Sequence, residues 1–141
     1  MSFINANNSY LCNEKYFNMN DIQTEGDIET LVHTFYAKVR ADEMLSPIFN
    51  AVIKGDWDEH LGKMCDFWGT LLLYTRKYRA DPMEKHMSLP LEGKHFERWL
   101  TLFNETIAEL FEGTTANEAK RRAANIARLM QSVKNVANPY H

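Results

Sequence analysis

The stretch that decides the fold is DPMEKHMSLPLEGKHFERWLTLF, residues 81–103, in which a histidine lies between two prolines. The aspartate, the first proline and the glutamate two positions after it are typical of a helix start, and Pro90 ends that helix soon afterwards. We therefore predict a short helix that carries His86. A longer helix should follow and end at Gly113. Its apolar residues recur at helical spacing and are Phe96, Trp99, Leu100, Phe103, Ile107, Leu110 and Phe111.

Two long helices are predicted ahead of this stretch, each from a stripe of apolar residues. The first stripe consists of Ile28, Leu31, Val32, Phe35, Tyr36 and Val39. Thr24 and Asp27 precede it with the spacing of a capping pair. The second stripe consists of Trp57, Leu61, Met64, Trp68, Leu71 and Leu72. Asp56 and Glu59 have the same capping spacing at its start.

A short helical turn and a fourth long helix complete the pattern. Ser46 is the predicted N-cap of a turn that has Pro47 at its first position and ends near Phe49. The last helix should open on Thr115, with Glu118 as the other half of a capping box. Its inward residues are Ala119, Ala123, Ile126, Ala127, Met130 and Val133. No strand of convincing length is indicated, so the predicted fold class is all-α.

Composition limits the kind of protein. The 141 residues suffice for one domain, and we predict an N-terminal extension over residues 1–20 and a domain over residues 21–141. A net charge of −3 argues against a nucleic-acid partner. No apolar span long enough for a membrane and no leader pattern is present, and Cys12 and Cys65 suit free thiols in a reducing compartment. We therefore expect no membrane partner and a cytoplasmic location.

Two histidines should approach the same interior from different helices. His60 lies beside the second stripe, and His86 lies on the short helix. A buried imidazole nitrogen that lacks a partner costs about 1–3 kcal/mol, and the neighbouring apolar side chains offer it none. Imidazole is the commonest metal ligand, and haem iron takes one proximal histidine. Tyr36 and Trp99 could donate hydrogen bonds to a ligand on that iron, although each taken singly is more simply an ordinary core residue.

Several blocks of the sequence resemble the truncated haemoglobins, specifically their third group. The blocks are FYAKVR at 35–40, PIF at 47–49, WDEHLGKMCDFW at 57–68, KHMSLP at 85–90 and HFERWLTLF at 95–103. Their order and gaps also match, over about residues 21–135. The glycine-pair motifs of the first two groups are missing around residues 76–86. The resemblance implies the truncated globin fold, a two-over-two helical sandwich around haem b (iron protoporphyrin IX).

The resemblance also implies a role for each matching residue. His86 would be the proximal ligand of the haem iron. Tyr36, His60 and Trp99 would face the bound ligand on the distal side and would carry any catalysis. The residues implied to contact the haem, besides His86, are Phe49, His60, Met64, Phe67, Tyr78 and Phe96. At the Y-x-G-x-P pattern that Tyr78 matches, Ala80 replaces the glycine.

The leading hypothesis is a haem protein that binds dioxygen, carbon monoxide, nitric oxide or a similar small ligand, as in oxygen transport, with a reductase as a possible partner. The same pocket could serve a haem-dependent oxidoreductase, peroxidase-like or acting as a nitric oxide dioxygenase. A carboxylate-bridged metal centre is set aside, because EGKH at 92–95 is a single Glu-x-x-His motif and such centres need two. A cofactor-free helical interaction module stays open.

Overall fold

Helices account for most of the chain that the computed structural model describes, residues 19–78 and 90–137, with side chains described up to residue 132. The described helices are α2 (Glu25–Ala41), α3 (Ser46–Ile53), α4 (Trp57–Leu73), α6 (Gly93–Leu110) and α7 (Thr114–Ala137). No strand occurs within these ranges. The short helix predicted around His86 and most of the predicted extension lie outside the described residues. The all-α prediction is confirmed.

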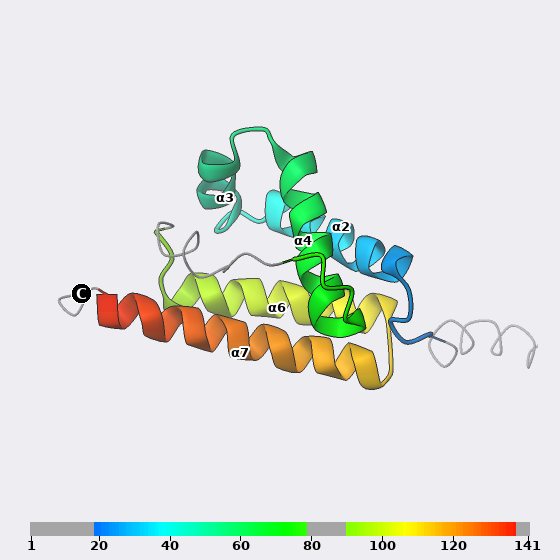
Figure 1. The fold of residues 1–141 in the computed structure, drawn as a ribbon. Helices are drawn as coiled ribbons and strands as arrows, with labels where there is room; N and C mark the ends of the chain where they lie inside the picture. Colours follow the sequence, from blue (N-terminus) through cyan, green and yellow to red (C-terminus); the bar gives the residue numbers. More distant parts are fainter. Residues whose placement is uncertain (1–18, 79–89, 138–141) are drawn as a thin grey trace, which may run out of the picture.

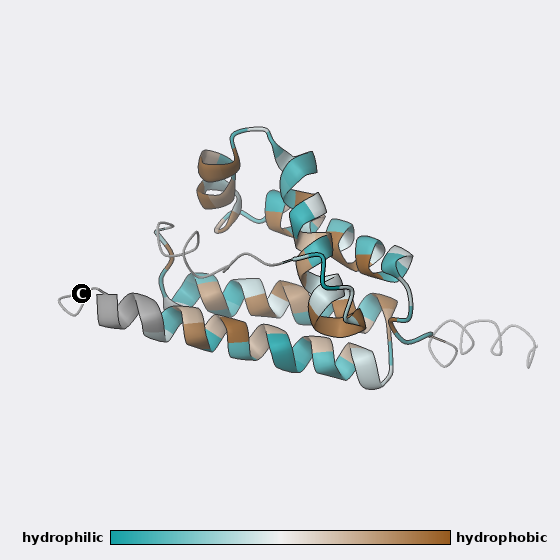
Figure 2. Ribbon diagram, in the orientation of Figure 1, coloured by the Kyte–Doolittle hydropathy of each residue, from teal (hydrophilic) through white to brown (hydrophobic). Residues whose placement is uncertain are grey.

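The helices form two crossed pairs (Figure 1). α6 and α7 lie side by side, and α2 packs against both α4 and α6. α4 reaches across to touch α7, and α3 adjoins α2 at the corner before α4. Hydrophobic and hydrophilic residues alternate along α2, α6 and α7 (Figure 2), as expected of helices that turn one apolar face toward the core, whereas α3 is mainly hydrophobic. This is the predicted two-over-two arrangement.

α2 begins as the sequence predicts. The Thr24 hydroxyl accepts a hydrogen bond from the N–H of Asp27 at 3.1 Å, and the Asp27 carboxylate accepts one from the N–H of Thr24 at 3.1 Å. Two N–H groups that the first turn leaves without intrahelical partners are thereby satisfied. The predicted stripe is buried throughout, and its members are Ile28, Leu31, Val32, Phe35, Tyr36 and Val39.

α3 departs from the prediction at both ends. Ser46 is the first residue of the helix and not its N-cap, and the helix runs past Phe49 to Ile53. α3 has no side-chain cap, and the Asp42 carboxylate instead orders the turn before it by accepting hydrogen bonds from the N–H of Leu45 at 3.0 Å and from the residue before it at 3.1 Å. Because these bonds already order the turn, the Ser46 hydroxyl is not needed as a cap.

α4 begins at Trp57 as predicted, but the predicted capping bond is absent. Asp56 is the N-cap residue and makes no standard capping bond, although a hydrogen bond with the side chain of Glu59, its predicted partner, raises the pKa of Asp56. Its backbone, at φ −92° and ψ 50°, lies outside the extended region that aims a capping side chain at the helix. The predicted apolar stripe of α4 is buried, apart from Leu71, which is half-buried.

α6 starts with a reciprocal pair of capping hydrogen bonds between Glu92 and His95. It ends at Leu110, slightly before the predicted end at Gly113, with Phe111 as its C-cap. The N–H of Glu92 donates to Nδ1 of buried His95 at 2.8 Å, while the Glu92 carboxylate accepts from the N–H of His95. Nδ1 therefore acts as an acceptor and the imidazole closes the helix start. Leu100 and Leu110, which were predicted as core residues, are half-buried. Leu102 is buried, although it was not predicted as a core residue.

The start of α7 corrects another capping prediction. The helix begins at Thr114, and the N–H groups of Thr115 and Ala116 donate to the two carboxylate oxygens of Asp21, each at 2.8 Å. Glu118 does not close a box with Thr115 but pairs with Arg121 and Arg122. Asp21 is 94 residues from Thr115, so no local pattern could reveal it.

Aromatic rings fill the centre of the core. The rings of Trp68 and Phe103 stack at 4.8 Å, and those of Trp99 and Phe103 stack at 5.8 Å. Phe35 meets Phe103 and Trp99 edge-on, at 5.1 and 5.4 Å. These contacts join α2, α4 and α6 around one point, which lies next to the pocket described below. Among the described helices, none combines the length and apolar character needed to cross a membrane.

Candidate functional site

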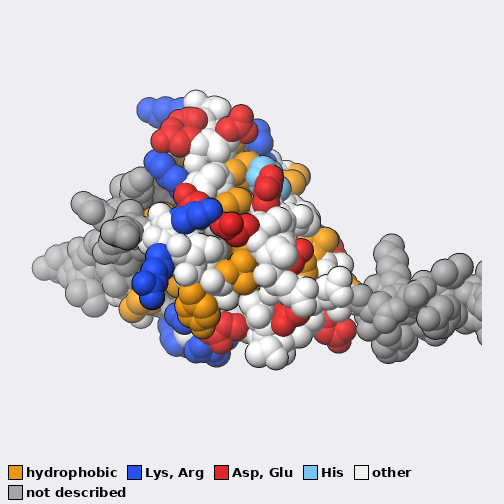
Figure 3. Space-filling model, turned by 45° about the vertical axis from the view of Figure 1, so that its right-hand side comes forward, with side chains coloured by type: hydrophobic (Ala, Val, Ile, Leu, Met, Phe, Trp, Pro, Cys, Tyr) orange, Lys and Arg blue, Asp and Glu red, His pale blue; other side chains and the backbone are white. Residues whose placement is uncertain are grey.

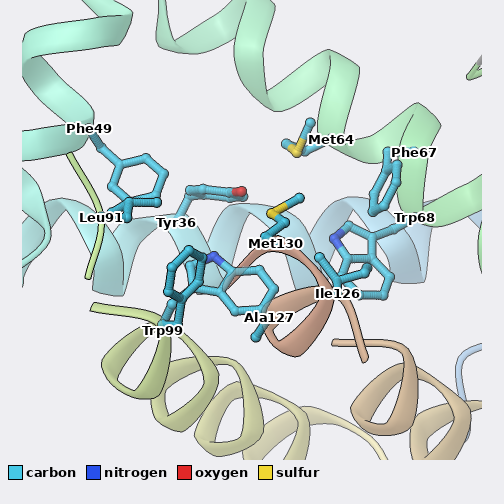
Figure 4. Close-up of a pocket in the computed structure, with 11 residues that line it drawn as sticks. Tyr36, Phe49, Met64, Phe67, Trp68, Leu91, Trp99, Ile126, Ala127 and Met130 are labelled. Carbon is cyan, nitrogen blue, oxygen red and sulfur yellow. The ribbon is translucent and has the colours of Figure 1, made fainter. Parts of the chain in front are cut away.

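An apolar pocket with about 520 Å³ of empty space, part of it open to solvent, lies between the two helix pairs (Figure 4). Sites for small molecules and cofactors are lined mainly by hydrophobic and aromatic side chains. All the described long helices and α3 contribute. The lining residues are Tyr36, Phe49, Met64, Phe67, Trp68, Leu91, Phe96, Trp99, Ile126, Ala127 and Met130.

The structure brings most of the predicted site residues together in this pocket. They come from separate elements: Tyr36 from α2, Phe49 from α3, Met64 and Phe67 from α4, and Phe96 and Trp99 from α6. Figure 4 shows the rings of Phe49 and Phe67 at opposite ends, with Tyr36, Met64 and Trp99 between them. The roles of the individual side chains stay predictions.

Tyr36 brings a buried polar atom into this apolar lining. The residue is only 3% exposed, and its hydroxyl oxygen points into the pocket in Figure 4. Burial raises the pKa of the Tyr36 hydroxyl above its ordinary value, and a hydrogen bond from the Trp99 side chain offsets only part of that rise. Because an indole N–H can only donate, the Tyr36 oxygen accepts this bond. The Tyr36 proton stays in place at neutral pH and can be donated elsewhere.

His60 lies beside the pocket and does not line it. Its ring meets the ring of Tyr36 edge-on, with centroids 5.1 Å apart and an interplanar angle of 90°. The Nε2 atom of His60 is buried. His60 is therefore close to Tyr36, one of the predicted distal donors, as the sequence suggests. Its predicted contact with a cofactor is not tested by this arrangement.

Tyr78 lies behind a lining residue. Its ring packs edge-on against Phe67, with centroids 5.2 Å apart, and its N–H donates to the Thr70 hydroxyl at 3.0 Å. Tyr78 thus supports Phe67 from outside the pocket, and is not among the lining residues. The predicted ligand of the iron, His86, lies outside the described residues, in the segment 79–89.

Five lining residues were not predicted as site residues: Trp68, Leu91, Ile126, Ala127 and Met130. Most of them belong to the predicted apolar stripes of α4 and α7, where a site residue and a core residue give the same signal. Only the crossing of α7 beneath α4 turns part of its stripe toward the pocket. Leu91 follows Pro90 outside any helix, so periodicity carries no signal for it.

Outside the pocket, the Cys65 thiol and the charged surface side chains do not form a second site among the described residues. Burial, reinforced by the charges of Glu29 and Asp66, raises the pKa of the Cys65 thiol to about 11, so it stays protonated at neutral pH. Lys77 pairs with Glu25 on α2 at 2.5 Å. Acidic and basic side chains are interspersed on the face shown in Figure 3. Within the described ranges, no group of three or more His, Cys, Asp or Glu side chains could hold a metal ion.

Comparisons with known proteins agree with this geometry. The family model for bacterial-like globins matches residues 19–135. The group 3 truncated hemoglobin ctb of Campylobacter jejuni subsp. jejuni serotype O:2 is 37% identical over 110 residues, which are 75% of this chain and 87% of that protein. The crystal structure of the group III truncated hemoglobin from Campylobacter jejuni aligns with a TM-score of 0.74 and 36% identity, covering 79% of this chain and 91% of that chain.

The chain therefore belongs to the bacterial-like globin family. Its resemblance to the third group of the truncated haemoglobins is confirmed by both Campylobacter jejuni proteins. Globin membership implies haem binding, and the lining of the pocket fits such a group: it is apolar and includes the Tyr36 hydroxyl and the Trp99 indole.

Proposed function

We propose that this chain holds haem b in the pocket between its helix pairs and binds dioxygen or another diatomic ligand at the iron, with His86 as the proximal ligand. The observation that carries the proposal is the buried Tyr36 hydroxyl, which accepts a hydrogen bond from Trp99 inside an otherwise apolar pocket. A hydroxyl buried only for packing would more simply be a phenylalanine, because burying a polar group costs free energy.

The haem would supply an iron atom with one coordination position open to a small ligand. The side chains of this chain would then select and hold that ligand. The Trp99 N–H occupies a lone pair of the Tyr36 oxygen and so orients the hydroxyl. The Tyr36 proton is left to be donated to a ligand with negative charge on its outer atom, and hydrogen bonds to charged acceptors are the stronger kind.

The remaining pocket residues would hold the flat ring and exclude water. Phe49 and Phe67 lie at opposite ends of the pocket, and Met64 lies between them on the α4 side (Figure 4). An apolar, dry surrounding strengthens the hydrogen bonds of the distal donors. Such a site favours slow release of dioxygen, which suits tight retention or chemistry better than bulk delivery.

The test is haem binding by the purified chain and by His86→Ala. We expect the wild type to bind added haemin and, once reduced, carbon monoxide. The His86→Ala variant should lose haem affinity by more than the roughly 10–100-fold that loss of a supporting partner costs a metal site. His33→Ala, which changes an exposed histidine of α2, is the matched control and should leave the visible spectrum unchanged.

A colourless wild type that refuses haemin would overturn the proposal. An unaltered spectrum of His86→Ala would overturn the assignment of the proximal ligand. If stopped-flow mixing of the loaded protein with peroxide or nitric oxide showed sustained turnover, the enzyme alternative would replace simple ligand binding.

A further inference from the structure

Three aromatic rings close a triangle beside the pocket. The centroids of Tyr36 and His60 lie 5.1 Å apart, those of His60 and Trp57 5.6 Å apart, and those of Trp57 and Tyr36 6.0 Å apart. All three separations fall within the range of about 4.5–7 Å at which aromatic rings attract each other. Tyr36 and His60 are the predicted distal residues, whereas Trp57 has no assigned role and does not line the pocket.

Trp57 is itself anchored by two other helices. Its indole N–H donates to Oδ1 of Asn50 on α3 at 3.1 Å. The guanidinium carbon of Arg40 on α2 lies 4.7 Å from the centroid of its ring, a cation–π distance. The Trp57 side chain is 5% exposed. The ring is therefore fixed by α2 and α3 at the point where α4 begins, and it cannot turn without breaking one of these contacts.

The position of Trp57 limits the movement of His60. The two residues are one helical turn apart on the same face of α4, so their side chains are neighbours. The interplanar angle of 88° between their rings matches the 90° between His60 and Tyr36, so the imidazole meets both rings edge to face. A rotation of the imidazole away from this place would lose both contacts.

We propose that Trp57 is a positioning residue that holds the His60 imidazole against Tyr36. It thereby fixes the orientation of both side chains toward a bound ligand. The inference rests on the proposed function, because it concerns a ligand in the same pocket. It goes beyond that function by assigning the geometry of the distal side to a residue that does not touch the pocket. A tryptophan that merely fills core volume would affect folding stability alone.

The experiment compares Trp57→Leu with Trp57→Phe in the haem-loaded protein, as its ferrous carbon monoxide complex. The readouts are the NMR signals of the His60 ring protons and the infrared stretching band of bound carbon monoxide. For Trp57→Leu we expect displaced His60 signals, a shifted or split carbon monoxide band, and dioxygen release faster by roughly two- to tenfold, the equivalent of losing one aromatic pair. Trp57→Phe keeps a ring in the triangle and should restore most of the wild-type behaviour.

Two further variants keep the test decisive if Trp57→Leu fails to fold. Asn50→Leu and Arg40→Leu replace exposed residues, so they release the Trp57 ring without emptying the core. Each should move the His60 signals in the same direction by a smaller amount. Unchanged His60 signals and an unchanged carbon monoxide band in the folded variants would overturn the positioning role.

These experiments distinguish failure of the proposed haem function from failure of the positioning role of Trp57. If the wild type takes up no haem, the proposed function is overturned, while the His60 signals of the haem-free chain still decide whether Trp57 holds the imidazole. If haem binds normally in every variant and the His60 signals do not move, the proposed function stands and the role of Trp57 is overturned.

Discussion

At the scale of single residues, the oxygen of the Tyr36 hydroxyl is the atom on which the proposed ligand site depends. It is buried among apolar side chains, and the Trp99 indole donates a hydrogen bond to it. Since burial raises its pKa, the hydroxyl stays protonated and remains a donor. A donor that is fixed in place before the ligand arrives costs no reorganisation when it acts.

Replacing Tyr36 with phenylalanine removes this donor and keeps the ring. In the haem-loaded protein we expect Tyr36→Phe to release dioxygen faster by roughly ten- to 150-fold, the equivalent of one hydrogen bond to a charged acceptor. Carbon monoxide, which carries little negative charge when bound, serves as the control ligand and should be released at a nearly unchanged rate. Stopped-flow displacement measures both rates. Equal rates for dioxygen in the variant and wild type would remove Tyr36 from the distal site.

At the scale of helices and loops, Asp42 ties the corner before α3 to α6. Its carboxylate accepts hydrogen bonds from the N–H groups of Leu45 and the residue before it, and from Nε of Arg98 at 2.7 Å. Arg98 precedes Trp99, and the corner leads to Phe49, so the bond links two elements that line the pocket. Burial opposes ionisation of Asp42, but these hydrogen bonds outweigh it and lower the pKa of Asp42 below 3.8.

This bond should make folding stability depend on pH. Because the pKa of Asp42 is lower in the folded than in the unfolded chain, its stabilisation is complete above the unfolded value of 3.8 and is lost as the pH falls through the folded value. We expect Asp42→Asn to cost about 1–3 kcal/mol at neutral pH. Urea unfolding at a series of pH values should show that this difference shrinks in acid.

Glu97→Gln is the control for Asp42→Asn, because it removes one negative charge from the exposed side of the same helix that carries Arg98. This control should change the stability by no more than about 0.5 kcal/mol. A difference between wild type and Asp42→Asn that stays constant down to about pH 3 would contradict the assigned role.

At the scale of the whole molecule, Asp21 joins the beginning of the described chain to the start of α7. The N–H of Glu112 donates to the Asn20 carbonyl at 3.1 Å, and Ile22 is buried, so this segment is packed into the domain. Partial burial opposes ionisation of Asp21, but hydrogen bonds from Thr115 and Ala116 hold its pKa below the ordinary value. The negative charge also suits the N-terminal end of a helix.

Gly113 makes this contact possible. A Cβ at Gly113 would lie 2.5 Å from Cγ of Asp21, and the glycine has φ +143°, which other residues rarely adopt. We expect Gly113→Ala to destabilise the fold by about 1–3 kcal/mol, measured by urea unfolding. Gly62→Ala is the matched control, because a Cβ at Gly62 would meet nothing within 4 Å, and it should be neutral or slightly stabilising.

A double variant separates the steric effect from the backbone effect. In the background of Asp21→Gly, which removes both the carboxylate and the Cβ that would lie 2.8 Å away, Gly113→Ala should cost clearly less than it does in the wild type. Equal costs in the two backgrounds would mean that the close approach of Asp21 is irrelevant and that only the backbone conformation of Gly113 matters.

Much of the architecture was predictable from periodicity. The stripes of α2, α4, α6 and α7 were recognised because a helix that buries one face must repeat its apolar residues every third or fourth position. The capping pair at Thr24 was correct since both its partners lie within one turn. The capping prediction was wrong at α3, which has no side-chain cap, and at α7, where Asp21 accepts the hydrogen bonds from a position far away in the sequence.

The sequence alone predicted the all-α class, the positions of the long helices and, through its resemblance to a known group of globins, six of the eleven side chains that line the pocket. Which apolar residues line the pocket and which fill the core followed from the way the helices pack against each other. Met130 and Ala123 lie on one stripe of α7, yet Met130 lines the pocket and Ala123 is fully buried. Periodicity specifies which face of a helix is buried, whereas the angle at which helices cross decides what each buried residue meets.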